Sequence, residues 1–145
     1  MYSIEEFDKQ KTRVLKYIMY KKRTESEIRT KFKNDIEENL LEDIIEYLKE
    51  ANYINDKEYI KKIMYEFMNL KTMSIKEIIY KLYNKGLPRN IIEDYVSENI
   101  DELEEFERKS AEKIINKKIH NTDPETIKNY LLRKGYKIEN IKIEE

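Results

Sequence analysis

A nine-residue pattern occurs twice in this chain, fifty positions apart, and each copy carries the signature of a helix start. TESEIRTKF begins at Thr24 and SIKEIIYKL begins at Ser74. Both read Ser or Thr, two residues, Glu-Ile, two residues, Lys, and then Phe or Leu. A hydroxyl residue followed three positions later by Glu is a capping box, in which side chains bond the free N–H groups of the first helical turn. The chain therefore repeats a helical unit about every fifty residues.

A third, looser copy begins at Asp123, where Pro124 takes the first helical position and Ile127 and Leu131 keep the apolar pair. A period of this length is typical of an array of helical units, because one unit alone cannot bury its apolar face. An irregular bundle whose helices only resemble one another stays open as the alternative.

Caps and stops divide the chain into nine expected helices. Further helix starts lie at Ser3, Asn34 and Asn55, and Gly86 and Gly135 are expected to end helices. The expected helices cover residues 4–22, 25–33, 35–51, 56–70, 75–85, 88–99, 101–119, 124–134 and 138–143. With 2 Gly and 2 Pro, the chain has few turn formers for β-structure. The prediction is an all-α, elongated array of three tandem three-helix repeats with helix-turn-helix-like units, at residues 1–54 (with an N-terminal extension), 55–99 and 100–145.

The joint between the first two predicted repeats, Asn52 to Asp56, is short and contains neither Gly nor Pro. Tyr53 and Ile54 are expected to plug this joint with apolar side chains, and Asn55 is expected to cap the helix that follows. We therefore interpret the joint as the seam between two structural repeats.

Charge is segregated along the chain, although the net charge is only -1. The net charge is +8 over residues 9–33, −7 over 34–58, +5 over 59–92, −8 over 93–107 and +4 over 108–145. In a stacked array equivalent helices line the same side, so basic and acidic helices could form separate stripes. A basic stripe could follow a nucleic-acid backbone or an acidic protein surface. The alternative is that these are ordinary solvated faces with charge pairing between neighbours.

Basic residues at matching repeat positions are the best candidates for binding a partner. Five of them stand at the ends of the first helices of predicted repeats: Lys21, Lys22, Arg23, Lys117 and Lys118. Two occupy the same position of the repeated pattern, Lys31 and Lys81. Three stand at the ends of middle helices, namely Lys85, Arg133 and Lys134. We expect these side chains to contact DNA phosphates or an acidic protein surface.

The order and spacing of four motifs resembles that of the RecX family of regulatory proteins. Arg23-Thr24 followed by Glu27-Ile28 and Lys31-Phe32 is similar to the family's opening repeat, and YLKEANYINDKEYI, from Tyr47, is similar to its inter-repeat signature. Ile78, Leu82 and Lys85-Gly86-Leu87 resemble the second repeat, and the stretch from Tyr130 to Tyr136 resembles the C-terminal one. The likeness covers nearly the whole chain. Departures from the family pattern concern turns: Asn52 and Thr72-Met73 stand where Gly is usual, Asn55 where an acid is common, and Asn34-Asp35 replaces Gly at the short turn of the first repeat.

The resemblance implies a modular, curved, all-α protein that docks in the helical groove of the RecA recombinase filament on single-stranded DNA. Such proteins restrain filament growth, ATP turnover and strand exchange. The resemblance also implies a cytoplasmic monomer that takes part in homologous recombination, DNA repair and the SOS response.

No catalytic, metal or cofactor site is expected from the sequence. The single His120 lies at a predicted helix end and has neither a Cys partner nor a nearby Ser relay. The acids between Asp101 and Glu105 crowd a helix start, where negative charge is stabilised without a metal. The chain has no Cys, which excludes disulfides and thiolate sites and fits the cytoplasm, and no apolar run approaches the length of a membrane span.

Two other functions stay open. Helix-turn-helix-like units could bind DNA on their own, but a pI near 6.1 and the lack of a middle helix suited to reading bases argue against tight autonomous binding. A generic helical scaffold for another protein would depend on neither DNA nor a recombinase. An enzyme is the least favoured of the alternatives.

Overall fold

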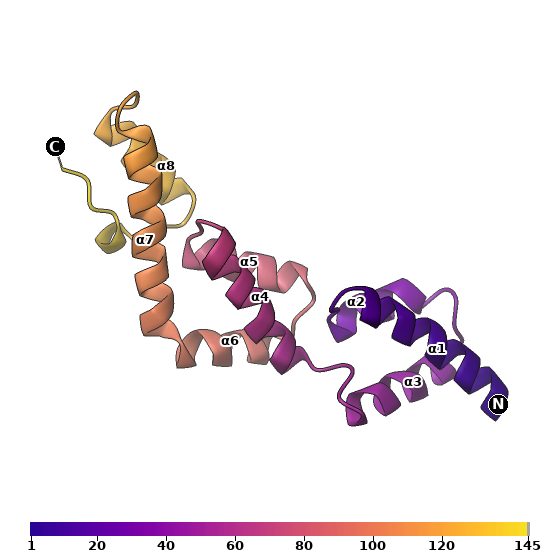
Figure 1. Cartoon of the computed structure of the whole chain (residues 1–145). Coiled ribbons are helices and arrows are strands. Elements are labelled where there is room, and N and C mark those ends of the chain that lie inside the picture. The colour runs from indigo at the N-terminus through magenta and orange to yellow at the C-terminus, as the bar shows by residue number, and fades with distance from the viewer. Residues whose placement is uncertain (145) are drawn as a thin grey trace. The chain divides into compact units, whose positions relative to one another are not determined.

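The protein is all-helical in the computed structural model, which describes residues 1–144 (Figure 1). Its helices are α1 (Ile4–Tyr20), α2 (Glu25–Phe32), α3 (Glu38–Glu50), α4 (Asp56–Leu70), α5 (Ile75–Asn84), α6 (Arg89–Glu98), α7 (Ile100–Lys118) and α8 (Pro124–Arg133), followed by the short 3₁₀ helix η1 (Ile138–Asn140). The described residues include no β-strand, which confirms the predicted all-α class. None of the helices in residues 1–144 combines the length and the apolar character that crossing a bilayer requires.

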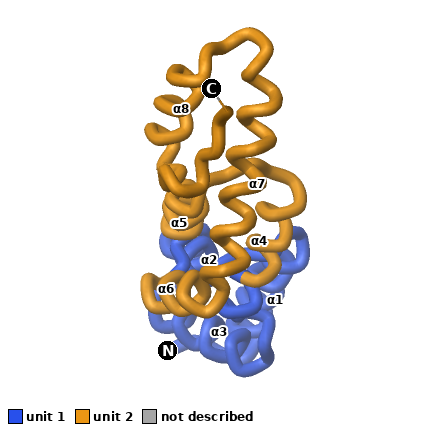
Figure 2. Tube along the Cα trace, turned by 90° about the vertical axis from the view of Figure 1, so that its left-hand side faces the viewer, with its two compact units in different colours: residues 1–60, 85–87 blue, residues 61–84, 88–145 orange. Residues whose placement is uncertain are grey.

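The chain divides into two compact units, which Figure 2 shows in different colours. Unit 1 contains residues 1–60 and 85–87, and unit 2 contains residues 61–84 and 88–145. Helix α4 begins in unit 1 and continues into unit 2. The three predicted repeat boundaries do not coincide with these two units and stay a prediction.

Unit 1 is built on the apolar faces of α1, α2 and α3. These helices bury residues at helical spacing, namely Val14 and Ile18 on α1, Ile28 and Phe32 on α2, and Leu40, Leu41, Ile44, Ile45 and Leu48 on α3. Helices α2 and α3, of 8 and 13 residues, are too short to be stable alone in water, so burial of this shared core holds the three helices together.

Unit 2 has a core where α7 and α8 meet the C-terminal segment. Ala111, Ile115, Ile127, Leu131 and Tyr136 form this cluster, and Ile141 and Ile143 pack against it. Helix α5 buries Ile75, Ile78 and Leu82 on one face. The opposite face of α5 is thereby left to solvent.

Both copies of the repeated pattern form the predicted capping boxes. The Thr24 side chain accepts a hydrogen bond from Glu27 N–H at 3.1 Å, and Glu27 Oε1 accepts one from Thr24 N–H at 2.9 Å. Ser74 and Glu77 repeat this exchange at 3.0 and 3.1 Å. The predicted caps at Ser3, Asn55 and Asp123 are also confirmed by hydrogen bonds from backbone N–H groups three residues later.

The predicted start of α3 at Asn34 is wrong. The backbone N–H groups of Asp35 and Ile36 both donate to the Phe32 carbonyl at 3.0 Å, so the chain turns there instead of starting a helix. This turn buries Ile36 in the core, and the helix starts only after Glu37, whose side chain accepts from Leu40 N–H. Burial of Ile36 therefore outweighs the local capping signal at Asn34.

The last predicted helix, residues 138–143, is also shorter than expected. Only Ile138–Asn140 is helical, as one 3₁₀ turn, and residues 141–144 are irregular. The Asn140 side chain is buried and donates to the carboxylates of Glu104 and Glu107. These side-chain bonds and the packing of Ile141 and Ile143 replace a second helical turn.

The joint after α3 turns through a left-handed residue. Asn52 has φ 64°, and Tyr53 N–H reaches back to the Leu48 carbonyl at 2.8 Å. Asn tolerates this conformation without a glycine. Ile54 is 4% exposed and plugs the joint as predicted, but the prediction for Tyr53 is wrong, because its side chain is 49% exposed.

Candidate functional site

Two of the predicted cations meet over one aromatic ring in unit 1. The Arg23 guanidinium lies 4.0 Å from the centre of the Tyr17 ring, and Lys31 Nζ lies 5.7 Å from the same centre. Tyr17 packs edge-to-face on buried Phe32, with the ring centres 5.5 Å apart. The negative π-face of Tyr17 attracts both cations and so holds two like charges near each other. We call Tyr17, Arg23 and Lys31 the Tyr17 cluster.

Unit 2 contains an equivalent group, the Phe67 cluster. Lys71 Nζ lies 5.6 Å and Lys81 Nζ lies 6.0 Å from the centre of the Phe67 ring. Phe67 and Lys81 stand fifty positions after Tyr17 and Lys31. The repeat period seen in the helix caps therefore extends to a charged, partly exposed feature of the surface.

A third group, the Tyr130 cluster, lies at the far end of α7. Lys118 Nζ is 4.4 Å and Lys134 Nζ is 5.6 Å from the centre of the Tyr130 ring. Here the ring comes from α8, at the position that Lys31 and Lys81 hold in the other copies of the pattern. Lys134 also pairs with Glu77 at 3.5 Å, and the negative charge of Glu77 raises the pKa of Lys134.

The structure brings together only part of the predicted binding residues. Arg23, Lys31, Lys81, Lys118 and Lys134 belong to the three clusters. Lys21, Lys22, Lys117 and Arg133 are exposed near the cluster residues in sequence, outside the ring contacts that define the clusters. Lys85 is half-buried, and its carbonyl accepts a hydrogen bond from Thr24 Oγ1.

Sequence reasoning missed the aromatic member of each cluster and Lys71. The spacing of Tyr17 and Phe67 was a usable signal, because it equals the period of the caps. Lys71 stands four residues after Phe67, a helical spacing that places neighbouring side chains together, so this spacing was a usable signal as well.

Two of the acids near the start of α7, Glu104 and Glu105, pair with side chains of the same protein. Glu105 pairs with Arg108 and Lys109, and Glu104 bonds Lys137 and Asn140. Over the described part of the chain, no three His, Cys, Asp or Glu side chains are grouped so that they could hold a metal ion. The acidic stretch therefore acts as a set of ion-pair partners and helix-start charges.

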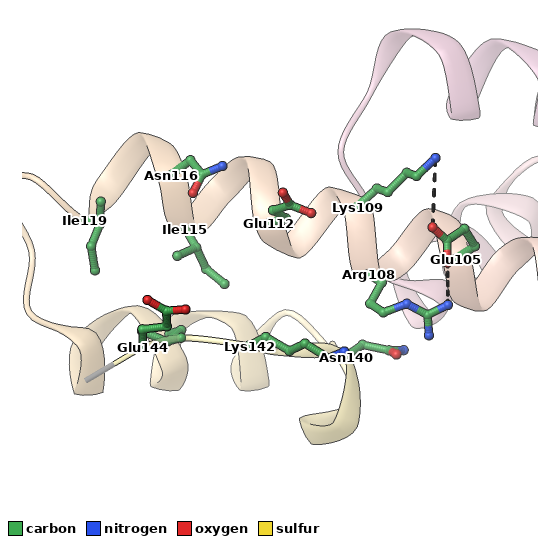
Figure 3. Close-up of a pocket in the computed structure, with 11 residues that line it drawn as sticks. Glu105, Arg108, Lys109, Glu112, Ile115, Asn116, Ile119, Asn140, Lys142 and Glu144 are labelled. Carbon is green, nitrogen blue, oxygen red and sulfur yellow. Dashed lines mark hydrogen bonds and ion pairs between the residues drawn. The ribbon is translucent and has the colours of Figure 1, made fainter.

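A groove of about 670 Å³ runs along α7 beside the C-terminal segment (Figure 3). Ile115, Ile119 and Ile143 supply its apolar lining. Its charged lining consists of Glu105, Glu112, Glu144, Arg108, Lys109 and Lys142. Because acids and cations balance, this groove offers a polyanion no net attraction, in contrast to the three clusters.

Comparison with known proteins connects the chain with one family, although no family model matches it. It is 33% identical over 103 residues to the regulatory protein RecX of Clostridioides difficile (strain 630), covering 71% of this chain and 48% of the relative. It is 32% identical over 154 residues to the RecX of Staphylococcus epidermidis, covering 99% of this chain and 56% of the relative. For the RecX of Clostridium beijerinckii the identity is 34% over 145 residues, with 93% of this chain and 66% of the relative covered. The chain thus spans about half the length of the first curated relatives it matches.

Solved structures agree with these relatives. The crystal structure of RecX from Lactobacillus salivarius superposes with a TM-score of 0.79 and 28% sequence identity, over 95% of this chain and 93% of that one. A second crystal structure of the regulatory protein RecX gives a TM-score of 0.79 at 25% identity, over 92% of this chain and 70% of that one. Sequence relatives and fold therefore agree, and the chain belongs to the RecX family of regulatory proteins.

Proposed function

We propose that this protein regulates a RecA recombinase, mainly as an inhibitor, by binding in the groove of the filament that the recombinase forms on single-stranded DNA. Binding would restrain filament growth, ATP turnover and strand exchange. The protein acts as a monomeric, non-catalytic regulator in the cytoplasm, where the recombinase meets chromosomal DNA.

The observation that carries this proposal is the recurrence of an aromatic–cation cluster three times along a RecX-family chain. A nucleoprotein filament presents phosphates and acidic side chains at regular intervals. A ligand with several cationic contacts engages such a lattice more tightly than any single contact allows, because each later contact forms within the complex. Charge recurring along one chain suits a repeating partner better than a single small ligand.

A retention experiment tests the proposal. The chain is passed over immobilised single-stranded DNA carrying the recombinase of the same organism and a non-hydrolysable ATP analogue. Parallel samples contain the DNA alone and the recombinase alone. The proposal predicts much stronger retention on the filament than on either component.

A variant with three charge reversals, one in each cluster, tests whether the clusters carry this binding. Arg23→Glu, Lys81→Glu and Lys118→Glu together should weaken retention by at least about tenfold. The matched control reverses three exposed lysines outside the clusters, Lys9, Lys57 and Lys113, and should leave retention nearly unchanged. Equal retention of wild type on bare DNA would favour autonomous DNA binding, and absence of retention on the filament would favour a scaffold for another protein.

A further inference from the structure

The exposed face of α5 carries two tyrosines and a lysine in one stripe. Lys76, Tyr80 and Tyr83 lie four and three residues apart, so their side chains project from the same side of the helix. The Tyr80 side chain is 68% exposed and that of Tyr83 is 43% exposed. Ile75, Ile78 and Leu82 hold the opposite side of α5 in the core. We call Lys76, Tyr80 and Tyr83 the α5 face.

Helix α5 carries exposed positive charge, of which Lys76 belongs to the α5 face. Lys76 and Lys81 are exposed, and Glu77 is the one acid of this helix. The Glu77 carboxylate is already engaged, because Oε1 accepts from Ser74 N–H and Oε2 pairs with Lys134. Helix α5 therefore presents exposed rings beside cations, with its acid committed elsewhere.

Packing fixes the start of this stripe. A Cβ placed on Gly135 would lie 2.8 Å from Lys76 Cβ and 3.1 Å from Lys76 Cδ. The aliphatic stem of Lys76 thus lies directly against the Gly135 backbone, within unit 2. This contact holds the stem of Lys76 at the first turn of α5, one turn before Tyr80.

We propose that the α5 face binds single-stranded DNA directly, with bases stacking on Tyr80 and Tyr83 and a phosphate pairing with Lys76. This inference rests on the proposed function and deepens it by naming a DNA contact within the filament. Aromatic side chains beside a positive groove or stripe are the usual means of binding single strands without sequence preference. The bases of a duplex are stacked on one another, so their faces are not available to the two rings.

The surroundings of the rings favour DNA over a protein partner. A protein-docking patch is typically enriched in aromatic residues, Met and Arg and depleted in Lys. On α5, which lies wholly within the described residues, Tyr80 and Tyr83 are the exposed large hydrophobic side chains, and Lys76, Lys81 and Asn84 share the exposed surface. Positive charge with isolated rings matches a phosphate backbone that carries separated bases.

The test is fluorescence anisotropy of the full chain with a labelled oligo(dT), at low salt and without recombinase. Tyr80→Ala with Tyr83→Ala should weaken binding by at least about tenfold, since stacking contributes substantially for each base. Tyr80→Phe with Tyr83→Phe should bind as the wild type does, because the rings remain. Control variants Tyr20→Ala and Tyr65→Ala remove exposed tyrosines from α1 and α4 and should bind normally.

Three outcomes would overturn the inference: no oligo(dT) binding by the wild type, equal binding by the double alanine variant, or equal loss in the alanine and phenylalanine variants. The retention experiment on filaments separates this failure from failure of the proposed function. A chain that binds filaments through the recombinase alone would keep full retention with both alanines present. A chain that binds oligo(dT) through Tyr80 and Tyr83 but not filaments would support the α5 face and refute the regulator.

Discussion

The Thr24 hydroxyl donates a hydrogen bond to the Lys85 carbonyl oxygen at 2.6 Å. Fifty positions later, the Ser74 hydroxyl donates to the Lys134 carbonyl at 2.7 Å. Each hydroxyl therefore caps its own helix and also binds the residue before a glycine at the end of a later helix. This double use explains why both copies of the pattern start with a hydroxyl residue.

Thr24→Val removes both hydrogen bonds while keeping the shape of the side chain. We expect it to lower the free energy of unfolding by about 2 kcal/mol, because a cap and a buried bond to a carbonyl are lost together. Urea denaturation followed by circular dichroism measures the change. Ser3→Ala is the control, since Ser3 is an exposed cap, and it should cost clearly less. Equal costs for the two variants would show that the Lys85 bond contributes nothing.

Gly86 occupies a position that no other residue fits. Its φ is 82°, and a Cβ there would collide with Cβ and Oγ of Ser26. Gly86→Ala should therefore destabilise the protein by roughly 1 kcal/mol or more, from strain and the collision together. Ser26→Gly removes the collision but itself weakens α2, so in urea denaturation Gly86→Ala should cost less in the Ser26→Gly background than in the wild type. Full stability of Gly86→Ala alone would contradict this account.

Glu107 is fully buried and joins three segments of unit 2. Its carboxylate accepts from Ile75 N–H at 2.8 Å, from Lys137 N–H at 3.2 Å and from the Asn140 amide. Glu107→Ala leaves these donors buried without their acceptor, and we expect a loss of about 3 kcal/mol in the free energy of unfolding. Glu112→Ala, on the exposed side of α7, is the matched control and should cost little. Near-equal stabilities of the two variants in thermal or urea unfolding would refute the role of Glu107.

Glu104 should make the free energy of unfolding depend on pH in the acid range. Hydrogen bonds from Lys137 and Asn140 lower the pKa of Glu104 below its ordinary value of 4.5. The ionised form is favoured in the folded state, so its contribution is complete above pH 4.5 and is lost as pH falls through the folded pKa. Glu104→Gln should flatten this part of the stability–pH curve, measured by urea midpoints between neutral and acid pH. An unchanged curve would exclude Glu104 as a source of the acid loss.

Two of the predicted binding residues can be tested as a pair: Lys81, on α5, and Lys85, just after its end. Lys81→Glu with Lys85→Glu should weaken filament binding several-fold, because phosphate or carboxylate contacts turn repulsive. Circular dichroism should show unchanged helicity. The control is Lys57→Glu with Lys113→Glu, which makes the same charge change outside the clusters. Unchanged binding would remove Lys81 and Lys85 from the interface.

Local signals predicted most of the helices correctly. The boxes at Thr24 and Ser74 and the stops at Gly86 and Gly135 depend on residues close in sequence, so they can be read without the fold. The start of α3 could not be read this way, because burial of Ile36 competes with the cap at Asn34. Tyr53 was misplaced for a related reason: one apolar side chain, Ile54, already fills the joint.

The candidate surface was only partly predictable. Matching positions identified Lys31 and Lys81. The rings beneath these lysines depend on how α1 lies against α2 and how α4 lies against α5. Among 12 tyrosines, nothing in the sequence distinguishes Tyr80 and Tyr83 from those that pack inside. Their exposure follows from which face of α5 the core takes up.

The central claim is that this chain restrains a recombinase, and ATP hydrolysis tests it most directly. The recombinase of the same organism is assembled on single-stranded DNA, and the chain is added below equimolar amounts. The account predicts a clear fall in hydrolysis, since one filament-bound copy affects many recombinase protomers. Unchanged hydrolysis up to a several-fold excess of the chain would contradict the account.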